Sequence, residues 1–247
     1  VQSGGIYNVA VGANAGTAIT TGIKNTFIGG LSGDATTDAD FNVGVGHNTL
    51  TTNVLGSRSV AVGYTALEAQ NPASAVDMYN TAVGHAAGFA VTTGTENTLI
   101  GGAAGDALTT ANANTAVGRL TLTNETSANG STAIGSEALK NQNVGGGGDA
   151  RNTAVGLLAG VNISTGVKNV ILGSRAGDAL TDADSNIAIG ESALSTDTLG
   201  SKSVAIGDSA LYAQNFTSAT DTYNVAVGYA VGVITLFSVS TTATKAT

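Results

Sequence analysis

A five-residue pattern of polar and apolar positions recurs along the chain. It begins with Asn or Ser, continues with a β-branched residue, a small or apolar residue and an aliphatic residue, and closes with Gly. Because β-branched side chains suit a pleated surface, each copy predicts a short strand, and its Gly predicts a corner. The pattern occurs thirteen times, beginning at Asn8, Asn25, Asn42, Ser59, Asn80, Asn97, Asn114, Ser131, Asn152, Asn169, Asn186, Ser203 and Asn224.

The spacing of these copies is 17, 17, 17 and 21 residues, three times over, which defines the 72-residue units 8–79, 80–151 and 152–223. A 17-residue period is too short for a strand with a packed helix and fits one coil of a solenoid. We therefore predict an all-β fold, a parallel β-solenoid (β-roll) of about 13 coils over residues 8–232, forming a rod roughly 60 Å long. A closed trefoil-like fold would use the three units but would not need the 17-residue spacing.

The two ends of the chain depart from this period. Residues 1–7 align with the end of a fourth coil and are interpreted as the tail of a preceding repeat. Residues 233–247 lose the period and are interpreted as a cap or an exit segment.

The third position of the pattern is apolar in every coil. It lies on the opposite strand face from positions two and four, and a solvent-facing row there should be polar. We therefore expect a hydrophobic stripe that packs against identical chains in a homotrimer. The alternative is a monomeric solenoid whose own return segments cover the row. The predicted trimer-interface residues are Ala10, Phe27, Ala61, Leu99, Ala133, Ile171 and Ala205.

Composition supports a repetitive fold. The chain of 247 residues has 35 Gly, one Pro, no Cys and no Trp, and its apolar 42% is mostly Ala and Val, which argues against a single conventional core. Charged residues make up 11% and the mean hydropathy is positive, so disorder is not expected.

Charge and special residues narrow the partners. The net charge is −8 and the basic residues are scattered, so nucleic acid is not an expected partner. The lack of Cys excludes disulfides and thiolate zinc sites without deciding the compartment. The apolar stretch Val231–Phe237 is far shorter than the roughly 20 residues that span a bilayer, so membrane insertion is not expected.

The segments SVAVGYTAL, STAIGSEAL and SVAIGDSAL resemble the head repeats of trimeric autotransporter adhesins, which are left-handed parallel β-rolls. The coil NTLIGGAAGDALTT is similar to arrays in phage tail-fibre-like proteins. The resemblance covers Asn8 to about Gly232, although the coils here are longer than the family repeat. It implies a homotrimeric extracellular fibre, either on a virion as a phage or virus tail or surface fibre, or on the bacterial cell surface as an adhesin head.

An acidic cluster in the first unit has an echo in the third. Carboxylates suit Ca²⁺, but the spacing matches no recognised calcium loop. An intercoil ion pair explains the pattern better, because Asp40 with Arg58 and Asp184 with Lys202 are lost together in the second unit. No metal site is therefore predicted. The two clusters are Asp34, Asp38 and Asp40, and Asp178, Asp182 and Asp184.

The remaining candidate chemistry is interpreted as structural. The recurrent Asn row is expected to form a hydrogen-bonded ladder, and His47 and His85 to be surface residues. Gly145 to Gly148 lack the Lys and helix of a phosphate loop and are interpreted as a flexible loop. No catalytic residue and no cofactor are predicted, so the chain is not expected to be an enzyme. A polysaccharide-degrading β-helical spike is a remote alternative, and ice binding is not expected because Thr pairs recur only every fourth coil.

The 21-residue coils carry the most divergent segments, EAQNPASAVDMY, KNQNVGGGGDAR and YAQNFTSATDTY. Longer loops on a rigid scaffold often carry binding function. We expect them to contact a glycan or protein of a host or cell surface. The alternative is that they adjust the coil or bury Tyr79 and Tyr223. The aligned residues are Asn71, Asn143 and Asn215, and Asp77, Asp149 and Asp221.

Overall fold

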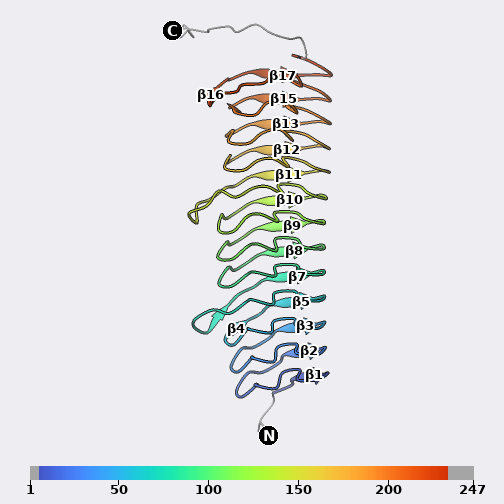
Figure 1. Cartoon of the computed structure of the whole chain (residues 1–247), viewed down its shortest axis with the longest axis vertical. Coiled ribbons are helices and arrows are strands. Elements are labelled where there is room, and N and C mark those ends of the chain that lie inside the picture. Colours follow the sequence, from blue (N-terminus) through green and yellow to red (C-terminus); the bar gives the residue numbers. More distant parts are fainter. Residues whose placement is uncertain (1–5, 233–247) are drawn as a thin grey trace.

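The structure, a computed structural model, describes residues 6–232 as a rod of stacked coils (Figure 1). Each coil contributes one short strand to a single 13-stranded sheet in which strands follow one another in chain order. The prediction of an all-β parallel solenoid of about 13 coils is confirmed. The predicted cap or exit segment, 233–247, lies outside the described residues, as do residues 1–5 of the predicted N-terminal tail.

All strands of the large sheet are three residues long and coincide with positions two to four of the repeat. Two further pairs of two-residue strands each join a long coil to the coil before it: β4 (Gly56–Ser57) with β6 (Val76–Asp77), and β14 (Gly200–Ser201) with β16 (Thr220–Asp221). The strands of the large sheet are β1 (Val9–Val11), β2 (Thr26–Ile28), β3 (Val43–Val45), β5 (Val60–Val62), β7 (Thr81–Val83), β8 (Thr98–Ile100), β9 (Thr115–Val117), β10 (Thr132–Ile134), β11 (Thr153–Val155), β12 (Val170–Leu172), β13 (Ile187–Ile189), β15 (Val204–Ile206) and β17 (Val225–Val227).

Neighbouring strands of the large sheet are parallel, and each residue pairs with the residue at the same repeat position in the next coil. Thr98 pairs with Thr115, for example, and Thr132 with Thr153 across the longer spacing. The four extra residues of each long coil are therefore accommodated outside the sheet. Figure 1 shows these longer loops projecting from one edge of the rod.

Position three faces the interior of the coil, so the predicted trimer-interface stripe is wrong. Phe27, Ala61, Leu99, Ala133, Ile171 and Ala205 are 0% exposed within the single chain. Ala10 is exposed, because β1 is the edge strand of the sheet within residues 6–232. The return segments cover this face with small residues at position eight, which is the alternative that the sequence left open. Those residues include Ala66, Ala104, Ala138, Ala176 and Ala210.

Positions nine and twelve of the coil share the remaining core volume. In the first two coils of a unit, Gly at nine accompanies an aliphatic residue at twelve, as with Gly160 and Ile163. In the last two coils, a buried Leu at nine accompanies a polar residue at twelve, as with Leu122 and Glu125. Gly33 is the exception, because the Phe27 ring fills the space beside it.

Candidate functional site

The long-coil loop of the first unit is held by a ladder of charged and aromatic side chains. Arg58 Nε lies 2.8 Å from Asp77 Oδ2, and the Tyr79 hydroxyl donates to the same carboxylate at 3.2 Å. The Arg58 guanidinium lies 4.7 Å from the centre of the Phe41 ring and 5.9 Å from that of Tyr79, while Lys24 covers Phe41 at 5.0 Å. Cation–π contacts and an ion pair therefore brace the loop against the coils beneath it.

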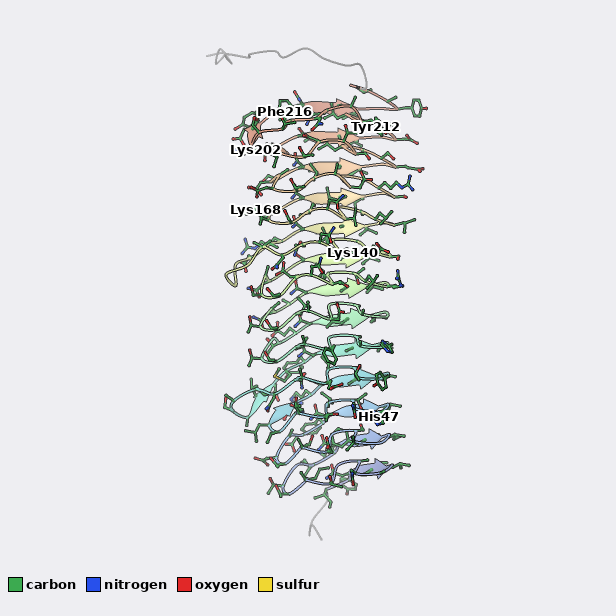
Figure 2. All side chains as sticks on the ribbon, in the orientation of Figure 1. His47, Lys140, Lys168, Lys202, Tyr212 and Phe216 are labelled. Atoms are coloured by element: carbon green, nitrogen blue, oxygen red, sulfur yellow. The ribbon has the colours of Figure 1, made fainter. Side chains whose placement is uncertain are left out.

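The third unit repeats this arrangement with different residues. Lys202 pairs with Asp221 and lies 5.4 Å from the centre of the Tyr223 ring. The hydrogen bond to Asp221 raises the pKa of Lys202, and the same bond lowers the pKa of Asp221. Lys168 and Lys202 lie along the edge from which the long loops project (Figure 2).

In the second unit, an ion pair and a hydrogen bond from a side chain to the loop backbone hold the long-coil loop. Arg151 pairs with Asp149, and the Asn129 amide donates to the Gly147 carbonyl at 3.2 Å. Each of the aligned aspartates Asp77, Asp149 and Asp221 is thus half-exposed and ion-paired, a partnership the sequence did not reveal.

The aligned asparagines lie in the same loops and are exposed. The backbone N–H of Asn71 donates to Thr92 O at 3.0 Å, and that of Asn143 to Ser164 O at 2.8 Å. The side-chain oxygen of Asn215 accepts a hydrogen bond from Thr198 at 3.4 Å. The loops therefore present accessible amides on an ordered backbone, and their contact with a receptor stays a prediction.

The predicted ion pairs of Asp40 with Arg58 and of Asp184 with Lys202 are wrong. Asp40 Oδ1 instead accepts the backbone N–H of Ile23 at 2.7 Å, and Asp184 Oδ1 that of Val167 at 2.8 Å. Asn112 does the same for Thr95 at 2.8 Å. An amide oxygen serves this role as well as a carboxylate, which explains the Asn in the second unit, while both basic side chains reach the following long coil.

The other acidic residues also accept local hydrogen bonds. Asp38 accepts from the Thr21 hydroxyl, Asp182 from Thr165 at 2.5 Å and Asp178 from Ser195 at 2.5 Å. Asp34 Oδ1 is buried without a partner. Among residues 6–232, no group of three or more His, Asp or Glu side chains is arranged to hold a metal ion.

The Asn row forms the ladder that the sequence predicted. Asn97 Oδ1 accepts the backbone N–H of Asn114 at 3.0 Å, and Asn97 Nδ2 donates to Ala111 O at 2.8 Å. Eight of the ten Asn side chains are fully buried, and only Asn8 and Asn224 at the two ends are accessible, so the row holds coils together.

The sequence did not reveal two buried acidic side chains, Glu125 and Asp197, at position twelve of their coils. Glu125 Oε1 accepts three backbone N–H groups, from Thr126, Ser127 and Ala128, at 2.8 to 3.0 Å, and its Oε2 accepts Gln142 Nε2 at 3.0 Å. Asp197 is the counterpart in the third unit. The available signal was the polar residue at position twelve next to Leu at position nine.

The outer face of the sheet carries positions two and four. Position four is Val, Ile or Leu in all thirteen coils, and position two is Val, Ile or Thr. Ile28, Ile100 and Ile134 are about 40% exposed, and the other position-four residues are partly or fully exposed. We call these two rows the outer stripe, which runs along the whole sheet from Val9 and Val11 to Val225 and Val227.

Two further surface features agree with expectation. His47 and His85 are exposed, and they stack on either side of Tyr64 with ring centres 5.8 and 5.3 Å away (Figure 2 labels His47). An added Cβ at any of Gly145 to Gly148 would meet nothing within 4 Å, as in an open loop. Residues 6–232 include no helix with the length and apolarity to cross a membrane.

No protein-family model matches the chain, and a search of curated proteins found no match.

Proposed function

We propose that this chain is a structural segment of a homotrimeric extracellular fibre, a phage or virus tail or surface fibre in the first instance. The outer stripe supports this proposal. It is about 60 Å long, its position-four row is aliphatic and at least partly exposed in every coil, and accessible apolar rows of this kind mark protein contact surfaces.

An identical chain is the best-matched partner for the stripe. Its side chains repeat every ~4.8 Å over thirteen strands, and a second copy offers the same repeat with the same shape. Three copies around an axis parallel to the rod would bury all three stripes, whereas position three, already inside the coil, would contribute nothing. The proposed trimer interface therefore lies on positions two and four, on the strand face opposite to the position-three row expected from the sequence.

The braced long loops support a role in surface recognition. They recur every four coils, roughly 19 Å apart along the rod, and a trimer would display each loop three times. Repeated display turns weak contacts with a glycan or protein into useful avidity. Ordered loops also lose less conformational entropy on binding.

Sedimentation equilibrium tests the assembly. We expect three times the chain mass of 24.0 kDa for the unaltered chain. Ile100→Asp with Ile134→Asp places two charges in the stripe and should give monomers with an unchanged β circular dichroism spectrum. Leu157→Asp changes a residue that is 51% exposed outside the stripe and should stay trimeric. A monomeric unaltered chain would overturn the trimer.

Immunogold labelling with antibodies to the purified chain tests the location. Label on virion tails or surface fibres supports the leading proposal. Label on bacterial surfaces would instead favour the head domain of a trimeric autotransporter adhesin, and label confined to the cytoplasm would contradict both.

A further inference from the structure

A groove of about 410 Å³ lies on one corner of coils three to six. It runs between two rows of side chains, one directly after the corner Gly and one four residues further along each coil. The first row supplies Tyr64 and His85, the second supplies Glu68, Phe89 and Asp106, and the floor consists of Asn48, Thr65 and Ala86.

One wall of the groove is aromatic. Tyr64 is stacked between His47 and His85, which fixes the ring, and it remains 52% exposed. Phe89 across the groove is 42% exposed. The next residue along the first row is Gly102, and an added Cβ there would meet nothing within 4 Å. The groove therefore offers fixed ring surfaces and open space beside His85.

The polar groups of the groove lack donors. Asn48 Oδ1 and Asp106 Oδ1 are buried without a hydrogen-bond partner, and the Glu68 carboxylate forms no ion pair within residues 6–232. No Lys or Arg lines the groove. Burial raises the pKa of Asp106, and its hydrogen bonds with the Thr123 side chain and with the backbone only partly offset this effect. In the described part of the chain, the groove thus has one oxygen of Asp106 and one of Asn48 without a donor, and a Glu68 carboxylate without an ion-pair partner.

The solenoid itself does not require this chemistry. One unit later, the positions of His47, Tyr64 and Glu68 are occupied by Arg119, Ser136 and Lys140 on the same backbone. There, Arg119 and Lys140 both pair with Glu137, at 3.2 and 3.0 Å. The His47, Tyr64 and Glu68 part of the lining is therefore a local departure from the repeat, whereas Asp106 has counterparts in Asp34 and Asp178.

We propose that this groove binds a cationic side chain, the guanidinium of Arg or the ammonium of Lys, on a protein partner. Such a group supplies only hydrogen-bond donors and favours the faces of aromatic rings. Its positive charge would also pair with the carboxylates of Glu68 and Asp106. A neutral sugar could donate from its hydroxyl groups but carries no positive charge to pair with the two carboxylates. The acceptors lie on coils three, four and six, about 14 Å from end to end, which suits a long side chain on an extended peptide.

Every lining residue belongs to one chain, so the groove does not depend on trimer formation or on the fibre proposal.

Saturation-transfer difference NMR on the full chain tests the proposal with acetyl-Gly-Arg-Gly-amide as the probe. The matched control peptide carries citrulline, which has the shape of Arg without its charge. We expect saturation transfer to the Arg peptide and at least tenfold less to the citrulline peptide. Equal transfer to both peptides, or transfer to methyl glucoside and not to the Arg peptide, would overturn the proposal.

Two variants test whether the Arg peptide binds in the groove. Glu68→Gln and Asp106→Asn should each weaken binding about tenfold, as expected for loss of a charge-assisted hydrogen bond. Asp34→Asn is the matched control, because Asp34 has the same repeat position as Asp106 but lies outside the groove. Unchanged binding in both groove variants, with circular dichroism showing an intact fold, would contradict the assignment.

Discussion

Single residues in this rod adopt backbone conformations that the stacked coils impose. Besides the corner Gly, three positions in each of the first twelve coils have positive φ, and most are not Gly: Leu120, Leu122 and Tyr79 have φ of 56°, 49° and 51°. Such residues are normally uncommon there. Here hydrogen bonds to neighbouring coils hold them, for example from Leu120 N to Gly102 O at 3.0 Å.

The corner Gly after each strand is different, because space as well as φ requires it. Gly101 has φ of 138°, and an added Cβ would lie 2.4 Å from the Gly118 carbonyl oxygen in the next coil. Gly101→Ala should lower the free energy of unfolding by about 3 kcal/mol or more. Gly102→Ala, one residue on and in open space, should change it by less than about 0.5 kcal/mol. Urea denaturation measures both, and equal effects would refute the close-packing argument.

Two carboxyl groups should affect stability in opposite directions with pH. Asp106 has a pKa raised by burial, so the stability it contributes is present below its unfolded pKa and is lost as pH rises through its folded pKa. Asp106→Asn should therefore stabilise the chain at pH 7 and have little effect near pH 3. Urea midpoints across this pH range measure the change.

Asp221 provides the comparison of opposite sign. The Lys202 hydrogen bond lowers its pKa, so its contribution is present above the unfolded pKa and is lost as pH falls through the folded one. Asp221→Asn should destabilise the chain at pH 7 and converge with the unaltered chain in acid. The same sign for both variants at pH 7 would contradict the assignments.

At the scale of the element, the strand and its return segment determine which face is the core. Positions three and four are apolar in every coil and position two is always β-branched, so the pattern of a three-residue strand does not show which face points inward. The buried residues at positions eight, nine and twelve decide the matter, because they pack against position three.

The shared volume of positions nine and twelve can be tested with a double-mutant cycle. An added Cβ at Gly160 would lie 2.9 Å from Ile163 Cδ1. Gly160→Leu alone should cost about 1–3 kcal/mol by overpacking, and Ile163→Ala about 2–5 kcal/mol by leaving a cavity. The double variant should be more stable than their sum by about 1–3 kcal/mol. Additive costs from urea denaturation would show that the two positions do not share space.

At the scale of the whole molecule, each coil contacts its neighbours and the rod is a repeat of one interface. Within residues 6–232, β1 and β17 each have a neighbouring strand on one side only, and their outer residues are the most exposed of the stripe. Stability should therefore depend on coil register more than on the number of coils.

Removing one complete unit should preserve the fold. Deletion of 80–151 joins Tyr79 to Asn152, and both Tyr79 and Arg151 have φ of 51° before the Asn that follows them. The rod should keep its β spectrum and shorten by about 19 Å in small-angle X-ray scattering.

Deletion of 80–142 is the control, because it leaves part of a long coil and breaks the period. We expect it to aggregate or unfold beyond the junction. A rod of similar order from this variant would show that register is not the requirement.

The sequence by itself determined the number of coils, their lengths, their parallel register and the structural role of the Asn ladder. A strict period fixes stacking, because every coil must offer its neighbour the same hydrogen-bonding groups. It also placed the longer loops with Asn71 and Asp77 and their counterparts, since an insertion into a regular coil must lie outside the sheet.

Only the tertiary structure decided what lies inside and what touches across coils. The inward face depends on where the return segment runs, and that path follows from the packing of Leu, Gly and polar residues across three positions. The partners of Arg58 and Lys202, and the acceptors gathered beside Tyr64, come from different coils. Side-chain reach and direction bring them together, and these are properties that a linear period does not encode.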